Sequence, residues 1–321
     1  MKVLITGSAG YLGRDVTAEA LLRGHDVVAF DINRGGLVHD KLVEMTGDVT
    51  DFDAVLRAAR GCDAVFHLAA ALAQFEPDEE RMHRVNVNGT ANALSAAHES
   101  GVRKFVYLSS VEVYGTDVPV PCPEDAPLSP EVQYGRDKVE GEELCWKYLE
   151  RGMEVTALRP PTINGPGQNE PFLVGQMEAI SKGKLTPLPG GGRTHLQMVY
   201  VGDVTDAIFR AAEMPEARGL AFNLGSDDVP TLKELARALY GRAGTRERFL
   251  DINPRLARAA VRALDRFGIS PVKPQHLEIA LRDYVFDTTL AKEVLGWRPT
   301  RTDIESALEA YDWFMSRGVG A

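Results

Sequence analysis

The sequence has few cysteines and no long apolar run. Only three cysteines occur among the 321 residues, and they lack the Cys-x-x-Cys spacing of a zinc or redox site. This odd number argues against a disulfide framework and for a reducing compartment. No stretch approaches the roughly 18 apolar residues that span a bilayer, and the residues before Gly7 are too few for a signal peptide. We therefore expect a cytoplasmic protein.

Basic residues are also fewer than acidic residues. Lys and Arg number 36 against 46 Asp and Glu, which gives a net charge of −10. A surface of that sign repels nucleic acid and anionic lipid unless a local basic patch intervenes. The sequence contains no contiguous run of Lys and Arg. We expect neither a nucleic acid nor a membrane as a partner.

Several catalytic signatures are missing as well. The seven histidines include no His-x-x-x-His pair, so we expect no bound metal of the zinc-hydrolase kind. No Gly-x-Ser-x-Gly elbow and no Gly-Lys-Ser/Thr loop occurs. These absences argue against an α/β-hydrolase and a P-loop nucleotidase.

What the sequence does contain is an alternation of apolar runs with segments of helical period. The strand-like runs are rich in β-branched residues and cover residues 2–7, 26–31, 42–48, 64–69, 104–110 and 155–159. The helical patterns between them cover residues 11–23, 52–60, 81–100 and 134–151. Strands that alternate with helices predict right-handed crossovers and an α/β fold with a Rossmann-like, doubly wound parallel sheet.

The pattern changes after Arg159. Pro160-Pro161 and Asn164-Gly165-Pro166-Gly167 interrupt it, and we expect a loop over residues 183–192. Helical patterns and one strand-like run follow, at residues 203–213, 221–225, 232–240, 254–267 and 302–315. The sequence thus predicts a large domain, residues 1–160 plus about 196–227. A smaller, discontinuous C-terminal α/β domain takes about 161–195 and 228–321.

A glycine-rich loop follows the first strand. In Gly7-Ser8-Ala9-Gly10-Tyr11-Leu12-Gly13, the glycines allow a sharp turn and a close approach to a pyrophosphate, which the helix N-terminus then faces. Asp31 ends the second strand, where its carboxylate can bind ribose hydroxyls and repel a 2′-phosphate. The pattern predicts bound NAD in preference to NADP, although Arg34 lies nearby. A tight turn without a ligand is the alternative.

One tyrosine has a lysine four residues later, in Tyr134-Gly135-Arg136-Asp137-Lys138. On a helix this spacing puts both side chains on one face. The preceding strand ends at Ser109 and Ser110, on the ligand side of a doubly wound sheet. A nearby ammonium lowers the pKa of a phenol, so Tyr134 is a candidate general base beside Lys138, with Ser110 holding the substrate oxygen.

Together these motifs resemble the extended short-chain dehydrogenase/reductase family, in its NAD-dependent sugar epimerase/dehydratase branch. The resemblance covers essentially the whole chain. Beyond the glycine loop, Asp31 and Tyr134-x-x-x-Lys138, it rests on Gly47-Asp48-Val49, His67-Leu68-Ala69-Ala70, Asn86-Val87-Asn88-Gly89-Thr90, Ser109-Ser110-Val111-Glu112-Val113-Tyr114-Gly115, Leu158-Arg159-Pro160, Gly165-Pro166-Gly167, Val199-Tyr200-Val201-Gly202-Asp203 and Leu295-Gly296-Trp297-x-Pro299.

The resemblance implies roles for individual residues. The catalytic set it implies is Ser110, Tyr134 and Lys138, with Glu112 as a further candidate. The NAD-binding set is Gly7, Gly10, Tyr11, Leu12, Gly13, Asp31, Asp48, Val49, Leu68, Ala69, Ala70, Asn86, Tyr134, Lys138 and Pro161. The substrate-binding set is Ser110, Val111, Glu112, Thr162 and Arg193. It also implies a homodimer joined through helices over residues 82–100 and 133–149.

The sequence departs from the nucleotide-sugar pattern at three single positions and in the segment before Phe286-Asp287, which lacks the usual Arg-Pro-Gly-Asp element. Leu196 stands where an Arg usually binds the diphosphate, Thr162 where an Asn is common, and Val111 where dehydratases carry an Asp. The first interpretation is a nucleotide-sugar epimerase or dehydratase that transfers a hydride transiently at a secondary alcohol. The alternatives are a dehydrogenase or reductase of a non-nucleotide secondary alcohol and a non-catalytic NAD sensor.

Overall fold

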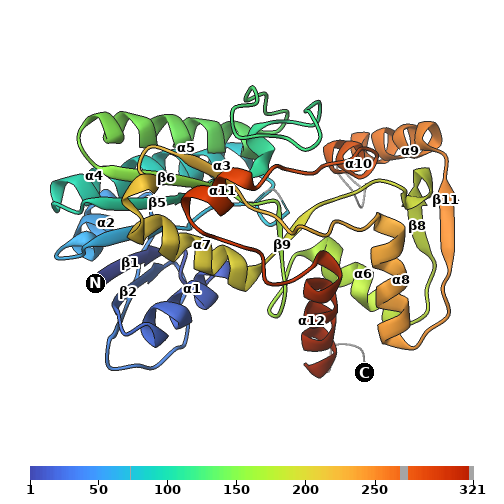
Figure 1. Cartoon of the computed structure of the whole chain (residues 1–321), viewed down its shortest axis with the longest axis horizontal. Coiled ribbons are helices and arrows are strands. Elements are labelled where there is room, and N and C mark those ends of the chain that lie inside the picture. Colours follow the sequence, from blue (N-terminus) through green and yellow to red (C-terminus); the bar gives the residue numbers. More distant parts are fainter. Residues whose placement is uncertain (73, 268–273, 318–321) are drawn as a thin grey trace.

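A computed structural model describes residues 1–72, 74–267 and 274–317. Within these residues, seven parallel strands form one sheet in the order β10-β6-β5-β4-β1-β2-β3 (Figure 1). The strands are β1 (Lys2–Thr6), β2 (Asp26–Asp31), β3 (Leu42–Thr46), β4 (Ala64–His67), β5 (Lys104–Leu108), β6 (Glu154–Arg159) and β10 (Ala221–Asn223). This is the predicted Rossmann-like, doubly wound fold.

Both faces of the sheet are covered, which explains why its strands are apolar. On β1, Val3 and Ile5 belong to one buried core, while Leu4 belongs to a second core on the opposite face. Helices α1 (Tyr11–Leu22) and α7 (Val201–Glu213) contribute to the first core. Helices α2 (Phe52–Ala59), α4 (Gly89–Glu99) and α5 (Gln133–Glu150) contribute to the second. Strands buried on both faces need no alternation of polar residues.

A smaller group of elements lies at the other end of the molecule (Figure 1). Its core gathers Met177, Tyr240 and Phe314 from three helices distant in sequence. The elements there are α6 (Pro171–Ser181), β8 (Thr186–Pro189), α8 (Leu232–Ala243), β11 (Phe249–Ile252), α9 (Pro254–Arg266), α10 (Pro274–Ala280) and α12 (Asp303–Ser316). Two short strands, β7 (Thr162–Asn164) and β9 (Met198–Tyr200), pair in parallel.

The prediction of a loop over residues 183–192 is wrong in part. Residues Thr186–Pro189 form β8, which pairs in parallel with β11. The partner strand lies about sixty residues further along the chain, so local sequence gives no sign of the pairing. Within the described residues β11 is the only partner of β8, and a strand with one free edge tolerates proline. A turn through Gly190–Gly192 follows, with positive φ at all three glycines.

The single helix expected over residues 81–100 is three consecutive segments. They are α3 (Glu79–His83), a π-helical turn (Arg84–Asn88) and α4. Helix α11 (Thr289–Val294) lies in sequence between α10 and α12 of the smaller group, yet Ala291, Leu295 and Trp297 pack into the first core of the large sheet. Residues 268–273 and 318–321 of the predicted second domain lie outside the described residues. Among the described helices, none is long and apolar enough to cross a membrane.

Candidate active site

The glycine loop connects β1 to α1 at the carboxyl edge of the sheet. Gly7 has a φ of 71°, and a Cβ there would lie 2.7 Å from the backbone nitrogen of Ala69. A Cβ on Gly13 would lie 2.0 Å from the Gly7 carbonyl oxygen. Gly10 is exposed, and its nearest such contact is 3.2 Å. Gly7 and Gly13 therefore close the turn, and Gly10 leaves the backbone open to a ligand.

Asp31 lies at the end of β2 and is tied to this loop. Its carboxylate accepts hydrogen bonds from the N–H groups of Ala9, at 3.0 Å, and Asn33, at 2.9 Å. The side chain is half-buried, whereas Arg34 is exposed. An acid fixed beside the glycine loop fits a ribose diol and disfavours a phosphate there.

Asp48 and Val49 follow β3, on the same edge. Val49 is buried, and its carbonyl accepts a hydrogen bond of 2.9 Å from the Asn92 amide. A Cβ on Gly89 would lie 2.6 Å from Val49, so this glycine lets α4 approach. Asp48 accepts a hydrogen bond from the N–H of Thr50 and is exposed. The two residues follow β3 at the same edge of the sheet as Asp31, which ends the neighbouring strand β2.

The residues that follow β4 lie against the glycine loop, at Gly7. Leu68 is buried and donates its N–H to Thr6, while Ala69 and Ala70 are half-buried. Asn86 fixes the next residue, Ala71, through two hydrogen bonds to its backbone, of 2.7 and 3.0 Å. This path of small side chains fits the middle of a dinucleotide.

Ser110, Tyr134 and Lys138 come together beyond the end of β5. The Ser110 side chain lies close enough to the Tyr134 hydroxyl to oppose the rise in its pKa, and it accepts the N–H of Glu112. The Lys138 ammonium lies 5.5 Å from the centre of the Tyr134 ring. It donates a hydrogen bond of 2.7 Å to the carbonyl of Leu108, the last residue of β5. The predicted trio is thus one cluster.

Asp137 supports this cluster, and the sequence analysis missed it. Its buried carboxylate accepts hydrogen bonds from Asn86 at 3.2 Å and Gln133 at 2.7 Å, and hydrogen bonds His83 at 2.9 Å. It links the path after β4 to α5, the helix that carries Tyr134 and Lys138. The sequence did contain a signal for this role. Asp137 precedes Lys138 directly on the predicted helix, and a carboxylate buried there needs hydrogen-bond partners.

Burial shifts the pKa values of the candidate catalytic groups Lys138, Tyr134 and Glu112. It lowers the pKa of Lys138 to about 8, although the charge of Asp137 opposes this shift. It raises the pKa of Tyr134 above its usual value, and the charges of Glu112 and Asp137 add to that effect. Burial also raises the pKa of Glu112 to about 7, against the opposing charge of Lys138. Tyr134 therefore needs further positive charge to act as a base near neutral pH.

A hydrophobic cluster that contains Val111 and Tyr284, with Leu196 packed against it, begins next to Ser110. Val111 is buried and accepts a hydrogen bond of 3.2 Å from the hydroxyl of Tyr284. The backbone of Tyr284 in turn bridges to Leu196. Pro161 is buried beside the end of β6, while Thr162 is exposed at the start of β7. Arg193 is exposed beside Gly191 on the turn after β8. Leu196, in contrast, is paired with Tyr284.

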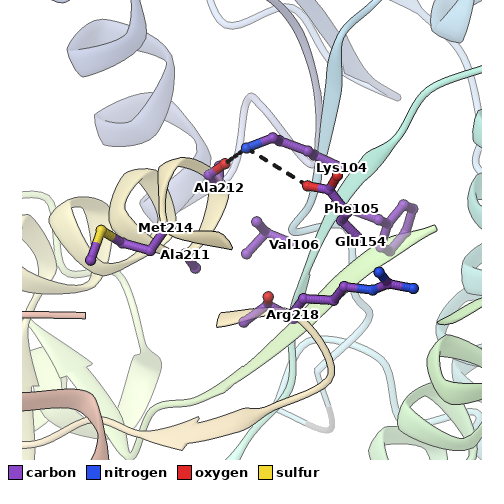
Figure 2. Close-up of a pocket in the computed structure, with 9 residues that line it drawn as sticks. Lys104, Phe105, Val106, Glu154, Ala211, Ala212, Met214 and Arg218 are labelled. Atoms are coloured by element: carbon purple, nitrogen blue, oxygen red, sulfur yellow. Dashed lines mark hydrogen bonds and ion pairs between the residues drawn. The ribbon is translucent and has the colours of Figure 1, made fainter. Parts of the chain in front are cut away.

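A small hollow lies at the opposite end of the strands and is not this site. Its volume is about 10 Å³, and Lys104 and Glu154, the first residues of β5 and β6, line it (Figure 2). The Lys104 ammonium donates to the Ala212 carbonyl and lies 3.8 Å from the Glu154 carboxylate. Among the described residues, no group of three or more His, Cys, Asp or Glu side chains could hold a metal ion.

The fold and the site together define a dinucleotide-dependent α/β enzyme of the extended short-chain type. The model of the NAD dependent epimerase/dehydratase family matches residues 3–225. The chain therefore belongs to the NAD-dependent epimerase/dehydratase family, and NAD is its cofactor.

Relatives within this family carry different activities. UDP-glucose 4-epimerase of Mycolicibacterium smegmatis is 30% identical, over 99% of both chains. A 3 beta-hydroxysteroid dehydrogenase/Delta 5→4-isomerase of Mycobacterium tuberculosis is 29% identical, over 98% of this chain and 90% of its own. Among solved structures, UDP-glucose 4-epimerase of Thermotoga maritima with UDP-glucose has a TM-score of 0.82 at 25% identity, covering 99% of both chains.

Proposed function

We propose that this chain is an NAD-dependent oxidoreductase of the epimerase/dehydratase type, acting on a secondary alcohol of a sugar. The observation that carries the proposal is the cluster of Ser110, Tyr134 and Lys138 at the carboxyl edge of the sheet, beside the glycine loop. A non-catalytic NAD sensor would have no need of all three side chains. The preserved cluster therefore favours an enzyme.

The glycine loop fits NAD, because Gly10 is open and Asp31 is fixed beside it. When bound, NAD supplies the hydride acceptor and a positive charge near the catalytic cluster. In our proposal Tyr134 takes the proton of the substrate hydroxyl at its phenolic oxygen, and Ser110 orients that hydroxyl. Lys138 stabilises the phenolate through its charge and also binds a ribose of the cofactor.

Our first choice of reaction is a nucleotide-sugar 4-epimerase. The support comes from relatives of that activity, which align over nearly the full length of the chain. Glu112, with its pKa near neutrality, is a second group that could transfer a proton to or from the sugar. Thr162 and Val111 would line the sugar site.

The second candidate is a dehydrogenase of a non-nucleotide secondary alcohol. Leu196 and Tyr284 form an apolar wall where the nucleotide-sugar pattern has an arginine. Arg193, the nearest substitute, is exposed on a turn. The hydroxysteroid dehydrogenase relative supports an apolar alcohol as the substrate class.

We further propose which parts of the chain bind the cofactor and which bind the substrate. Residues 1–160 and about 196–227 would bind NAD, and residues 161–195 and 228–321 would bind substrate, except for the α11 segment that packs on the large core. Two copies would pair through α4 and α5, which lie side by side (Figure 1). A cytoplasmic location stays a prediction.

Absorbance spectroscopy separates the two candidates. The purified enzyme is mixed with NAD and either UDP-glucose or an apolar secondary alcohol such as a 3β-hydroxysteroid. An epimerase converts the sugar nucleotide, as chromatography of the products detects, without net accumulation of NADH. A dehydrogenase accumulates NADH in proportion to the alcohol consumed. Conversion of neither class of compound would contradict both candidates.

A further inference from the structure

Helix α9 is basic and amphipathic. In Pro254–Arg266 it carries four arginines and one aspartate, in a chain whose net charge is −10. The arginines are spaced three or four residues apart, so no contiguous basic run marks them in the sequence. Only the helix brings them together on one side.

The apolar residues of α9 do not all face inward. Ala257 is buried, but Leu256 is 67% exposed and Phe267, at the C-cap, is 76% exposed. At about 100° per residue, Leu256, Ala260, Ala263 and Phe267 fall within about 60° of one another. This line of residues, which we call the apolar edge, runs the length of the helix outside the packed face.

Three of the four arginines border the apolar edge, and their side chains form no ion pair within the part of the chain that the structure describes. Arg258 forms an ion pair of 2.8 Å with Glu278 of α10. The side chains of Arg255, Arg262 and Arg266 are exposed and have no ion pair with any residue that the structure describes. These three fall within about 40° of one another around the helix. The exposed part of α9 therefore combines an apolar edge with an adjoining strip of unpaired positive charge.

Although the net charge predicts no membrane partner, α9 supplies a local basic patch, and we propose that this part of α9 binds the surface of an anionic lipid bilayer. A helix of this kind lies in the membrane interface, with its apolar side chains among the acyl chains and its arginines among the phosphates. A second copy of the chain fits less well, because symmetric pairing of two α9 helices would juxtapose six unpaired arginines. Nucleic acid fits the arginines but leaves Leu256 and Phe267 in water.

The location of α9 also favours this surface. The helix lies at the outer edge of the smaller part of the molecule (Figure 1). Its neighbour α10 reaches the active site, since Ile279 packs against the cluster that contains Val111 and Tyr284. Because the net charge of the chain is negative, the remaining surface would be repelled by the same lipid. The enzyme would thus bind in one orientation, with the smaller, proposed substrate-binding part toward the bilayer.

Sedimentation with vesicles tests the proposal on the full chain. Vesicles of phosphatidylglycerol and phosphatidylcholine should pull down the protein, and vesicles of phosphatidylcholine alone should not. Arg255→Gln, Arg262→Gln and Arg266→Gln together should weaken binding about 100-fold. Leu256→Ser with Phe267→Ser should also weaken it, because insertion of the apolar edge is lost. These exposed substitutions should leave NAD binding and the thermal midpoint unchanged.

Matched controls separate α9 from net charge and from self-association. The triple variant Arg57→Gln, Arg60→Gln and Arg103→Gln removes the same charge from exposed positions on the dinucleotide-binding part, and Leu22→Ser removes an apolar side chain that is 82% exposed. Both should bind vesicles like the wild type. The proposal is overturned if anionic vesicles do not bind the protein, or if the control triple weakens binding equally. A change of oligomeric state in the Leu256→Ser, Phe267→Ser variant would identify the apolar edge as a subunit contact and also overturn it.

Discussion

The Lys138 ammonium lies 5.5 Å from the centre of the Tyr134 ring, one helical turn away on α5. Its hydrogen bond to the Leu108 carbonyl fixes it against the end of β5. Burial lowers the pKa of this ammonium to about 8, so it is charged at neutral pH and loses that charge as the pH rises through 8. The stabilisation of a Tyr134 phenolate by Lys138 should therefore be strongest below pH 8.

Replacing Tyr134 by Phe should separate catalysis from binding. The ring keeps its packing and loses only the hydroxyl, so turnover should fall about 10²- to 10⁴-fold while NAD affinity changes little. Lys138→Met should reduce both, because Lys138 also binds the cofactor in our proposal. Steady-state kinetics and calorimetry measure the two effects. Tyr148→Phe, on the same helix, is the control, and near-normal turnover of Tyr134→Phe would refute the assigned base.

Glu112→Gln should show whether Glu112 acts by charge or by proton transfer. With a pKa of about 7, Glu112 is ionised above that pH, where its charge raises the pKa of Tyr134. If it acts by charge alone, the variant should keep its turnover and shift the acidic limb of the pH–rate profile to lower pH. A loss of about 10²-fold or more at all pH values would instead identify a proton-transfer group.

The same substitution should change stability in a defined pH window. The folded protein holds the Glu112 proton up to about pH 7, whereas an unfolded chain releases it near 4.5. The free energy of unfolding of the wild type should therefore fall, relative to Glu112→Gln, as the pH rises from 4.5 to 7. Chemical denaturation at several pH values measures this difference. A constant difference across the window would contradict the raised pKa.

Two substitutions in the glycine loop should fail in different ways. Gly10→Val adds a side chain where the backbone is open, so the protein should fold but lose NAD binding, which calorimetry detects. Gly13→Ala places a Cβ against the Gly7 carbonyl oxygen, so it should lower the free energy of unfolding by about 1–3 kcal/mol. Retained NAD affinity in Gly10→Val would contradict the placement of the cofactor.

Asp31 should set the choice between the two nicotinamide cofactors. We expect NAD to bind at least tenfold more tightly than NADP, about 1.4 kcal/mol, because the carboxylate would repel a 2′-phosphate. Asp31→Ser should narrow the ratio by improving NADP binding. Asp48→Ser is a control on the same edge of the sheet. Equal affinities of the wild type for the two cofactors would remove the basis for this role.

The sequence predicted the strands of the large sheet well. The pattern over residues 26–31 matches β2 at both ends, because strands buried on both faces must be continuously apolar. The same reasoning could not find β8 and β11, since their pairing joins residues 186–189 to 249–252 and includes two prolines. It also missed the π-helical turn before α4, where the helical period changes only locally.

The sequence by itself determined the glycine loop, the acid at the end of β2 and the Tyr134–Lys138 spacing, because each depends on local geometry. Only the tertiary structure decided which groups support them. Asp137 supports the site because folding brings Asn86 and His83 within hydrogen-bonding distance of it. Charge and burial act through space, so these relationships appear only when distant segments pack together.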